Sequence, residues 1–247
     1  AIKPVSHAVV NSPTPPILEN VLLRATNDKL TVIANNLEMA IEYTIERDIE
    51  IKEPGDITVS FRFLASYLGL LDPTRLKIKT DTGHTLNFTA NKQKMRYKGL
   101  GADEFPMIPA TRRDIKFAIS SDVLKRAFSK TLFSCASGNI RPTLAGVYIQ
   151  VHSDHVTFAS TDSFRLSEYR YNCDTGVDKK IAIILPARSA SEIMKTLPDG
   201  VGVELFFSDN QILIVYDNVL LYSRLLNGHF PDYGNFFPKT TSVNALT

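Results

Sequence analysis

The stretches Pro16-Ile-Leu-Glu-Asn-Val-Leu-Leu23 and Pro142-Thr-Leu-Ala-Gly-Val-Tyr-Ile149 begin two segments of thirty residues that align without a gap. The offset is 126 positions, and seven of the thirty aligned pairs are identical, among them Glu42-Tyr43 and Glu168-Tyr169. Chance would give about two identical pairs, and a fixed period of self-similarity is the mark of a repeated structural unit. The sequence therefore predicts one fold present twice.

The length and composition fit two such units. The chain has 247 residues, of which 44% are hydrophobic and 22% charged, enough for two domains of about 120 residues with their own cores. We expect a first domain at residues 1–113, without its N-terminal strand and part of its first helix, because residue 1 aligns inside a helix of the second copy. We expect a complete second domain at 114–240 and the start of a third at 241–247.

The composition also excludes several classes of protein. The longest apolar runs are too short to span a bilayer, and no charged-then-apolar leader opens the chain, so we expect no membrane partner. Cys135 and Cys173 occupy non-equivalent places in the two copies and favour a reducing compartment, the cytoplasm. The net charge is only +2, so the overall charge does not indicate DNA binding, and any basic surface that binds DNA must be confined to one part of the molecule.

The second copy predicts an antiparallel α+β domain with two helices. A strand at 115–119 leads to a helix capped by Ser120-Ser121-Asp122, in which Leu124, Ala127 and Phe128 recur at helical spacing. Strands follow at 144–151, 155–160, 165–171 and 181–185. A helix at 186–197 and strands at 203–208, 211–216 and 219–225 complete the copy. The order of helix and strands is typical of helices packed on antiparallel sheets.

Three strings identify a family resemblance. Arg141-Pro-Thr-Leu-Ala-Gly146, Ser160-Thr-Asp-Ser-Phe-Arg-Leu166 and Leu226-Asn-Gly-His-Phe-Pro-Asp-Tyr233 resemble the bacterial DNA polymerase III beta subunit, the sliding clamp. The resemblance covers the whole chain and spans the first two of that family's three domains. It implies duplicated clamp domains in a head-to-tail homodimeric ring that encircles double-stranded DNA without reading its sequence and tethers the polymerase. Phosphate contacts that are loose and salt-sensitive would permit sliding.

The resemblance also implies three sets of functional residues. DNA would be contacted by basic side chains on the inner helices and on the loop 137–141, namely Lys125, Arg126, Lys130, Arg141, Arg188 and Lys195. A pocket for short peptides of polymerases, the clamp loader and repair proteins would be formed by Leu144, Thr161, Ser163, Phe164, Arg165, Leu166, Pro231, Asn235 and Phe236. The ring interface would use Met95 and Tyr97 on the strand at 92–98.

Each of these sets has an ordinary structural explanation. Charges on a helix are usually its solvated face, Leu144 and Leu166 are compatible with plain core residues, and lysines on an edge strand protect it from aggregation. In the pocket, Phe164 stands where the family commonly has histidine. We expect the chain itself to be monomeric or weakly associated, which light scattering would test.

Catalytic motifs are missing from the sequence. His152 and His155 form an H-x-x-H string around a turn without a third ligand, and no nucleophile elbow, P-loop or dinucleotide motif occurs. We therefore expect a non-catalytic accessory subunit with no cofactor and no metal. Two alternatives stay open: a two-domain clamp of archaeal or eukaryotic type that closes as a trimer, and a small-molecule enzyme on duplicated α+β domains.

Overall fold

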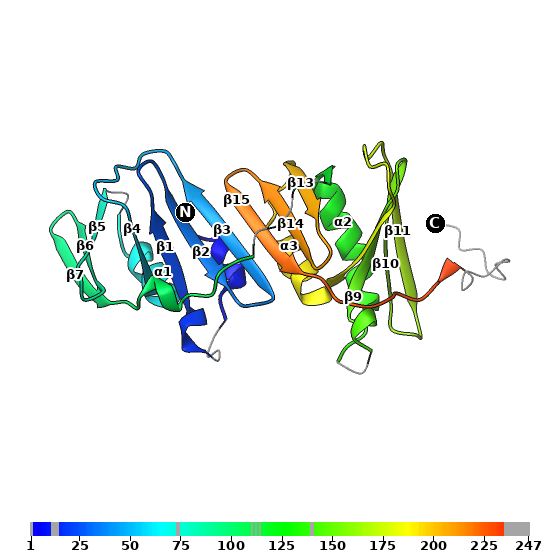
Figure 1. The fold of residues 1–247 in the computed structure, drawn as a ribbon, viewed down its shortest axis with the longest axis horizontal. Coiled ribbons are helices and arrows are strands. Elements are labelled where there is room, and N and C mark those ends of the chain that lie inside the picture. The colour runs from blue at the N-terminus through cyan, green and yellow to red at the C-terminus, as the bar shows by residue number, and fades with distance from the viewer. Residues whose placement is uncertain are drawn as a thin grey trace.

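Antiparallel strands dominate the computed structural model, which describes residues 2–10, 15–72, 75–109, 111, 113, 115–138 and 141–234 (Figure 1). The first copy contains β1 (Asn20–Ala25), β2 (Leu30–Asn35), β3 (Met39–Ile45), β4 (Gly55–Ser60), α1 (Phe61–Gly69), β5 (Leu76–Thr80), β6 (Thr85–Ala90) and β7 (Gln93–Lys98). The second contains β8 (Lys116–Ser120), α2 (Ser121–Thr131), β9 (Gly146–Val151), β10 (His155–Thr161), β11 (Leu166–Asn172), β12 (Ile181–Pro186), α3 (Ala187–Thr196), β13 (Gly202–Phe207), β14 (Gln211–Tyr216) and β15 (Val219–Arg224).

The duplication predicted from the sequence extends over β1 to β7, whereas β8 and most of α2 have no counterpart among the described elements of the first copy. Adding 126 to the bounds of β1, β4, β6 and β7 gives the bounds of β9, β12, β14 and β15. The predicted second-copy strands and helices all form, with bounds that shift by at most two residues. The largest shift is at β9, which begins at Gly146 because Pro142–Leu144 forms a 3-10 helix, with Ala145 N donating to Pro142 O at 3.0 Å.

Each copy contributes a pair of sheets, and the two copies share one of them. The sheet orders are β4-β1-β2-β3-β15-β14-β13-β8, β11-β10-β9-β12 and β5-β6-β7. The eight-stranded sheet is continuous because β3 pairs with β15, with Tyr43 opposite Val219 and Met39 opposite Ser223. This pairing joins the copies through backbone hydrogen bonds, which hydrophobic periodicity alone does not reveal.

Helix α2 forms for the reasons expected from its sequence. The Ser120 side chain accepts a hydrogen bond from Asp122 N at 3.3 Å, and Leu124, Ala127 and Phe128 are buried on one face. Phe128 packs edge-on against Phe158 of β10, with ring centroids 5.9 Å apart. Helix α1 corresponds to α3 by the 126-residue offset, and its Tyr67 packs on Phe88 of β6.

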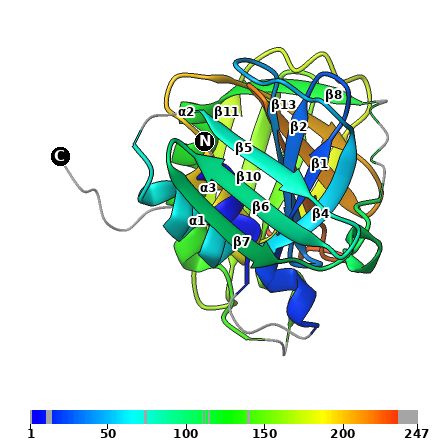
Figure 2. The same cartoon turned by 90° about the vertical axis from the view of Figure 1, so that its left-hand side faces the viewer.

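The three-stranded sheet forms one end of the molecule, away from β10 and β11, and faces the viewer in Figure 2. No helix within the described ranges is long and apolar enough to cross a membrane. Residues 241–247, where a third copy was expected to begin, lie outside the described residues.

Candidate functional site

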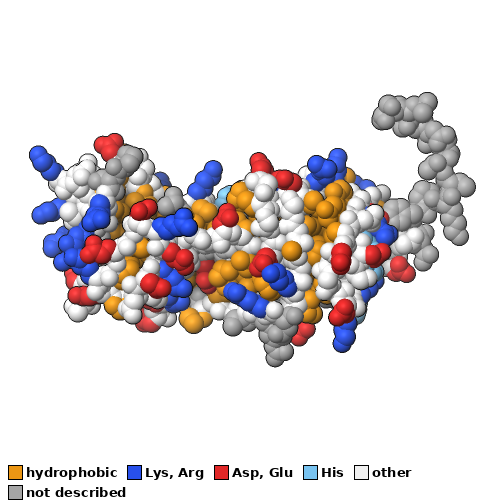
Figure 3. Space-filling model, turned by 90° about the horizontal axis from the view of Figure 1, so that it is seen from above, with side chains coloured by type: hydrophobic (Ala, Val, Ile, Leu, Met, Phe, Trp, Pro, Cys, Tyr) orange, Lys and Arg blue, Asp and Glu red, His pale blue; other side chains and the backbone are white. Residues whose placement is uncertain are grey.

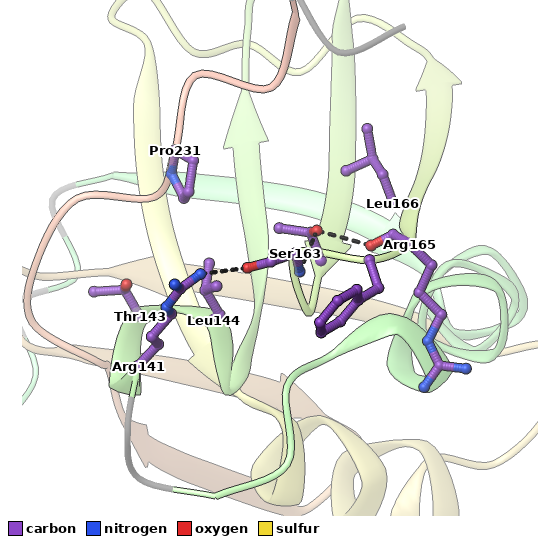
Figure 4. Close-up of a pocket in the computed structure, with 9 residues that line it drawn as sticks. Arg141, Thr143, Leu144, Ser163, Arg165, Leu166 and Pro231 are labelled. Atoms are coloured by element: carbon purple, nitrogen blue, oxygen red, sulfur yellow. Dashed lines mark hydrogen bonds between the residues drawn. The ribbon is translucent and has the colours of Figure 1, made fainter.

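An open pocket of about 660 Å³ lies at the start of β11 in the second copy (Figure 4). Its walls come from the 3-10 helix Pro142–Leu144, the end of β10, the turn 162–165 and the segment after β15. The lining residues are Arg141, Thr143, Leu144, Thr161, Ser163, Phe164, Arg165, Leu166 and Pro231. The structure thus brings together all seven described residues of the predicted peptide pocket, whereas Asn235 and Phe236 lie outside the described residues.

Asp162 organises the backbone of the turn 162–165 through hydrogen bonds. One carboxylate oxygen of Asp162 accepts hydrogen bonds from Phe164 N and Arg165 N, both at 3.0 Å, and the other accepts from Arg165 Nε at 2.9 Å. The bonds from the backbone of Phe164 and Arg165 lower the pKa of the Asp162 carboxyl. This pattern is an Asx-turn, which holds neighbouring side chains in fixed directions.

Thr161 and Ser163 hold the other side of the turn. Thr161 Oγ1 donates to Arg165 O at 2.7 Å and accepts from Ser163 N at 3.1 Å. Ser163 adopts a left-handed backbone conformation with φ of 79°. The Thr161 hydroxyl, expected to offer a polar edge to a ligand, therefore already serves the turn.

The pocket has an apolar floor and an aromatic residue at its rim, because Leu144 is 4% exposed and Phe164 is 97% exposed. Leu166 and Pro231 face the space between them (Figure 4). A buried floor beside a solvent-exposed phenyl ring suits a ligand that brings its own apolar side chains.

Arg141 is a pocket residue that the sequence assigned to another surface. Its Nη1 donates to Ser163 Oγ at 2.6 Å, so the guanidinium reaches across the pocket mouth, whereas Arg165 points away from it (Figure 4). Thr143 was also missed as a lining residue. The three-residue spacing between Arg141 and Leu144 could have indicated that both side chains line the pocket, because residues three apart lie on the same side of a 3-10 helix.

The other cations predicted to contact DNA lie on α2 and α3, which pack against each other. Lys195 pairs with Glu192 at 2.8 Å, Lys125 with Asp199, and Arg188 with Glu38 at 3.9 Å. Arg126 and Lys130 are exposed, and within the described part of the chain neither has a carboxylate within salt-bridge distance. Their helices place these charges together, and their role in DNA binding stays a prediction.

The two residues predicted for the ring interface lie on β7, an edge strand of its sheet. Met95 and Tyr97 share one face, opposite Phe88 and Leu86 of β6. Tyr97 stacks on Phe63 of α1 with centroids 4.1 Å apart, and Met95 is 41% exposed. Met95 is therefore the more available of the two, since Tyr97 already packs within its own copy.

Metal-binding and redox groups are sparse. His152 and His155 stack at 4.3 Å, and burial and the neighbouring His155 lower the pKa of His152. Within the described residues no group of three or more His, Cys, Asp or Glu side chains could hold a metal ion. Both cysteines are free, and burial raises the pKa of Cys135 to about 11.

Comparison with known proteins gives consistent matches. Residues 1–109 match the family model of the DNA polymerase III beta subunit, N-terminal domain, and residues 118–232 match that of its central domain. The chain is 26% identical over 253 residues to the beta sliding clamp of Bacillus subtilis, covering 100% of this chain and 67% of that protein. It is 28% identical over 237 residues to the beta sliding clamp of Staphylococcus epidermidis, covering 93% and 63%.

Solved structures agree with these matches. The crystal structure of the DNA polymerase sliding clamp from Bacillus subtilis matches with a TM-score of 0.92 and 28% identity, covering 97% of this chain and 65% of that one. The beta subunit of Streptococcus pyogenes DNA polymerase matches with a TM-score of 0.91 and 25% identity, with the same coverage. The chain thus spans about two thirds of the length of these relatives.

Proposed function

Because this chain belongs to the bacterial DNA polymerase III beta subunit family, we propose that it acts in a sliding clamp that encircles duplex DNA and tethers the replicative polymerase. The observation that carries this proposal is the pocket at Leu144, Leu166 and Pro231, which has an apolar floor and a turn fixed by Asp162. The pocket would receive short peptides of the polymerase, the clamp loader and repair proteins. The bacterial family matched here disfavours the two-domain archaeal or eukaryotic clamp.

The pairing of β3 with β15 supports a ring. By the repeat, β11 is equivalent to β3 and β7 is equivalent to β15, and both are edge strands of their sheets in the described part of the chain. An edge of one type that meets an edge of the other type is a heterologous contact, which closes into a ring when the rotation per unit divides a full turn. We propose that further copies of the fold, in a homodimeric ring, use β7 with Met95 and β11 in this way.

In this assembly the cations of α2 and α3 would contact phosphates loosely, so that the ring can slide. The work of the protein would be mechanical tethering, without catalysis, a cofactor or a metal, in the cytoplasm. Binding by encirclement needs no base-reading side chain, which suits helices that offer only Lys and Arg to the duplex.

A peptide titration tests the pocket. The probe is a fluorescent peptide from the clamp-binding segment of a bacterial polymerase, with its leucine and aromatic anchors, added to the 247-residue chain. Phe164→Ala should weaken binding about tenfold, because truncation of an interface anchor costs more than 1 kcal/mol. Phe164 is 97% exposed, so its removal should leave the unfolding temperature unchanged.

Phe133→Ala is the matched control, since this phenyl ring is 57% exposed and does not line the pocket. It should bind the peptide as the unaltered chain does. Equal affinity of all three proteins, or equal losses for both variants, would show that the peptide does not use the pocket.

A further inference from the structure

The outer face of the three-stranded sheet carries a dense array of positive charge. We call Lys77, Lys79, Lys94, Arg96 and Lys98 the cationic face; all five side chains are exposed. They share one side of the sheet because Leu86 and Phe88, which alternate with Asn87 on β6, are buried on the other side against α1. Lys79, Asn87 and Arg96 form one row across the strands, and Lys77, Thr89 and Lys94 form the next.

This array stands out against the charge of the chain as a whole. Residues 75–98 contain seven Lys or Arg and one Asp, a net charge of +6, whereas the other 223 residues contain 21 basic and 25 acidic side chains, a net charge of −4. Figure 3 shows Lys and Arg side chains gathered at the end of the molecule formed by β5, β6 and β7. A local excess of this size creates a positive potential that bulk composition hides.

Few of the carboxylates that the structure describes lie near the cationic face, so most of its positive charge is not compensated. Asp81, at the β5–β6 turn, is the acidic residue within 75–98, and backbone hydrogen bonding from Thr85 lowers its pKa, with Lys98 contributing. Asp81 therefore stays ionised and offsets the Lys98 end. In the described ranges Lys77, Lys79, Lys94 and Arg96 form no salt bridge, although Arg96 Nε donates to Asn87 Oδ1 at 3.0 Å.

The second copy shows what the same face looks like when protein covers it. From the strand pairing, Lys79, Asn87 and Arg96 correspond to Phe206, Leu213 and Tyr222. Those three residues form an apolar cluster against which Ile108 of the linker between the copies packs. The linker adds Arg113 over the Phe206 ring, at 5.6 Å from its centroid. The face that the linker covers in the second copy is thus apolar, whereas the first copy has polar and cationic side chains at the same places.

We propose that the cationic face binds the phosphate backbone of duplex DNA, as a surface separate from the cations of α2 and α3. Lys, Arg, Thr and Asn are the side chains that contact phosphates, and they make up this face. A protein partner would need aromatic or aliphatic anchors, which lie on the opposite side of β7 at Met95 and Tyr97. The face also offers no aromatic ring on which unpaired bases could stack, so it gives single strands no advantage over duplex.

Fluorescence anisotropy with a labelled duplex of mixed sequence tests this proposal on the 247-residue chain. The variant Lys77→Gln, Lys79→Gln, Lys94→Gln, Arg96→Gln should bind at least about tenfold more weakly at 50 mM salt, and its salt slope should fall by up to about 3.6, since each of the four phosphate contacts contributes about 0.9. A control with the same charge loss is Lys52→Gln, Arg170→Gln, Lys179→Gln, Lys180→Gln, all exposed positions elsewhere. The control should retain most of the affinity and slope.

A third variant distinguishes DNA binding by the cationic face from DNA binding by the cations of α2 and α3. Arg126→Gln, Lys130→Gln, Arg188→Gln, Lys195→Gln should also weaken binding on its own, and its combination with the outer variant should bind more weakly than either variant alone. If the helix variant alone abolishes binding and the outer variant binds as the unaltered chain does, the cationic face is not a DNA surface, while the proposed clamp function stands.

Two further probes distinguish the classes of ligand. A single-stranded oligonucleotide of the same length should bind no more tightly than the duplex, and a polyglutamate peptide should bind more weakly than either. A peptide that binds more tightly than DNA and is lost in the outer variant would overturn the proposal in favour of an acidic protein partner. Circular dichroism of each variant checks that all of them are folded, which exposed substitutions on a strand face should permit.

Discussion

The turns 35–38 and 161–164 occupy equivalent places in the two copies and differ in what covers them. Leu37 and Ser163 both adopt left-handed backbone conformations, with φ of 72° and 79°. In the first copy Asn35 Nδ2 donates to Pro106 O at 3.1 Å, and the linker residues Met107 and Ile108 leave a cavity of about 70 Å³. In the second copy the space is about 660 Å³. One scaffold therefore supports a site closed by its own linker and a site left open.

The residue that organises each turn also differs between the copies: it is Asn36 in the first and Asp162 in the second. Asn36 Oδ1 accepts from Glu38 N at 3.1 Å and Met39 N at 2.7 Å, and Asp162 does the same for Phe164 and Arg165. The two turns have the same hydrogen-bond geometry, but only Asp162 is charged and only the first-copy turn is covered by the linker. A site can thus be added to one copy of a duplicated fold through a few side chains on an unchanged turn.

The largest expected effect comes from placing the same charge at Ala40 and at its equivalent, Leu166. Ala40 is 4% exposed and lies two residues along the strand from Glu42, whose pKa is raised by burial. Ala40→Asp should lower the free energy of unfolding by about 3–5 kcal/mol, because an unpaired charge would be buried. Leu166→Asp should cost less than about 1 kcal/mol at its half-buried site, yet reduce peptide affinity about thirtyfold.

Urea denaturation and the peptide titration measure this pair of variants. Equal stability losses for Ala40→Asp and Leu166→Asp would mean that both sites are covered alike, which contradicts the comparison.

A smaller effect should follow from releasing the linker. Asn35→Ala removes the bond to Pro106 O and the 2.8 Å bond from Leu37 N to Asn35 Oδ1. The stability loss should be about 1–2 kcal/mol, because the half-buried Pro106 carbonyl loses its hydrogen-bond partner. Urea denaturation measures it against Asn87→Ala, which removes a single surface bond to Arg96 and should cost about 0.5 kcal/mol or less. Equal losses would show that Asn35 does not hold the linker.

The smallest effect separates Asp162 from Asn36 through pH. The folded-state pKa of Asp162 is lowered, so its stabilisation of the turn is fully present above the ordinary carboxyl pKa and is lost as the pH falls through the lowered value. The Phe164 and Arg165 amide signals should therefore shift in an acid NMR titration with a midpoint below about 3.9. The Met39 amide, which donates to the uncharged amide oxygen of Asn36, should show no such midpoint.

Asp162→Asn places at this turn the amide side chain that Asn36 supplies in the first copy. This variant should lose the acid transition of the Phe164 and Arg165 amide signals. A transition that persists in this variant would assign the titration to another group.

Sequence patterns predicted the local elements well because their signals are local. Ser120 as a cap, the apolar spacing of α2 and the strand at 211–216 all follow from residues close together in the chain. The pairing of β3 with β15 joins residues more than 170 positions apart and leaves no periodic signal. Closure of the first-copy site depends on Asn35 reaching Pro106, and the position of Arg141 depends on a bond to Ser163, so neither could be inferred from spacing alone.

The pocket residues were predicted through family motifs, and the described ones lie around one pocket because those motifs lie at the ends of paired strands. That this pocket binds peptides stays a prediction. The cationic face was visible only in part, as an edge strand rich in lysine. Its full extent requires the β5–β6–β7 register, which brings Lys77 and Lys79 beside Lys94 and Arg96.

The most direct test of the comparison is an NMR titration of the chain with the polymerase peptide, following both turns at once. We predict saturation at one peptide per chain, with shifts at the Leu144, Ser163 and Leu166 amides and none at Leu37, Glu38 and Ala40. Equal shifts at both turns, or shifts at the first-copy turn alone, would contradict the claim that the linker closes one site and leaves the other open.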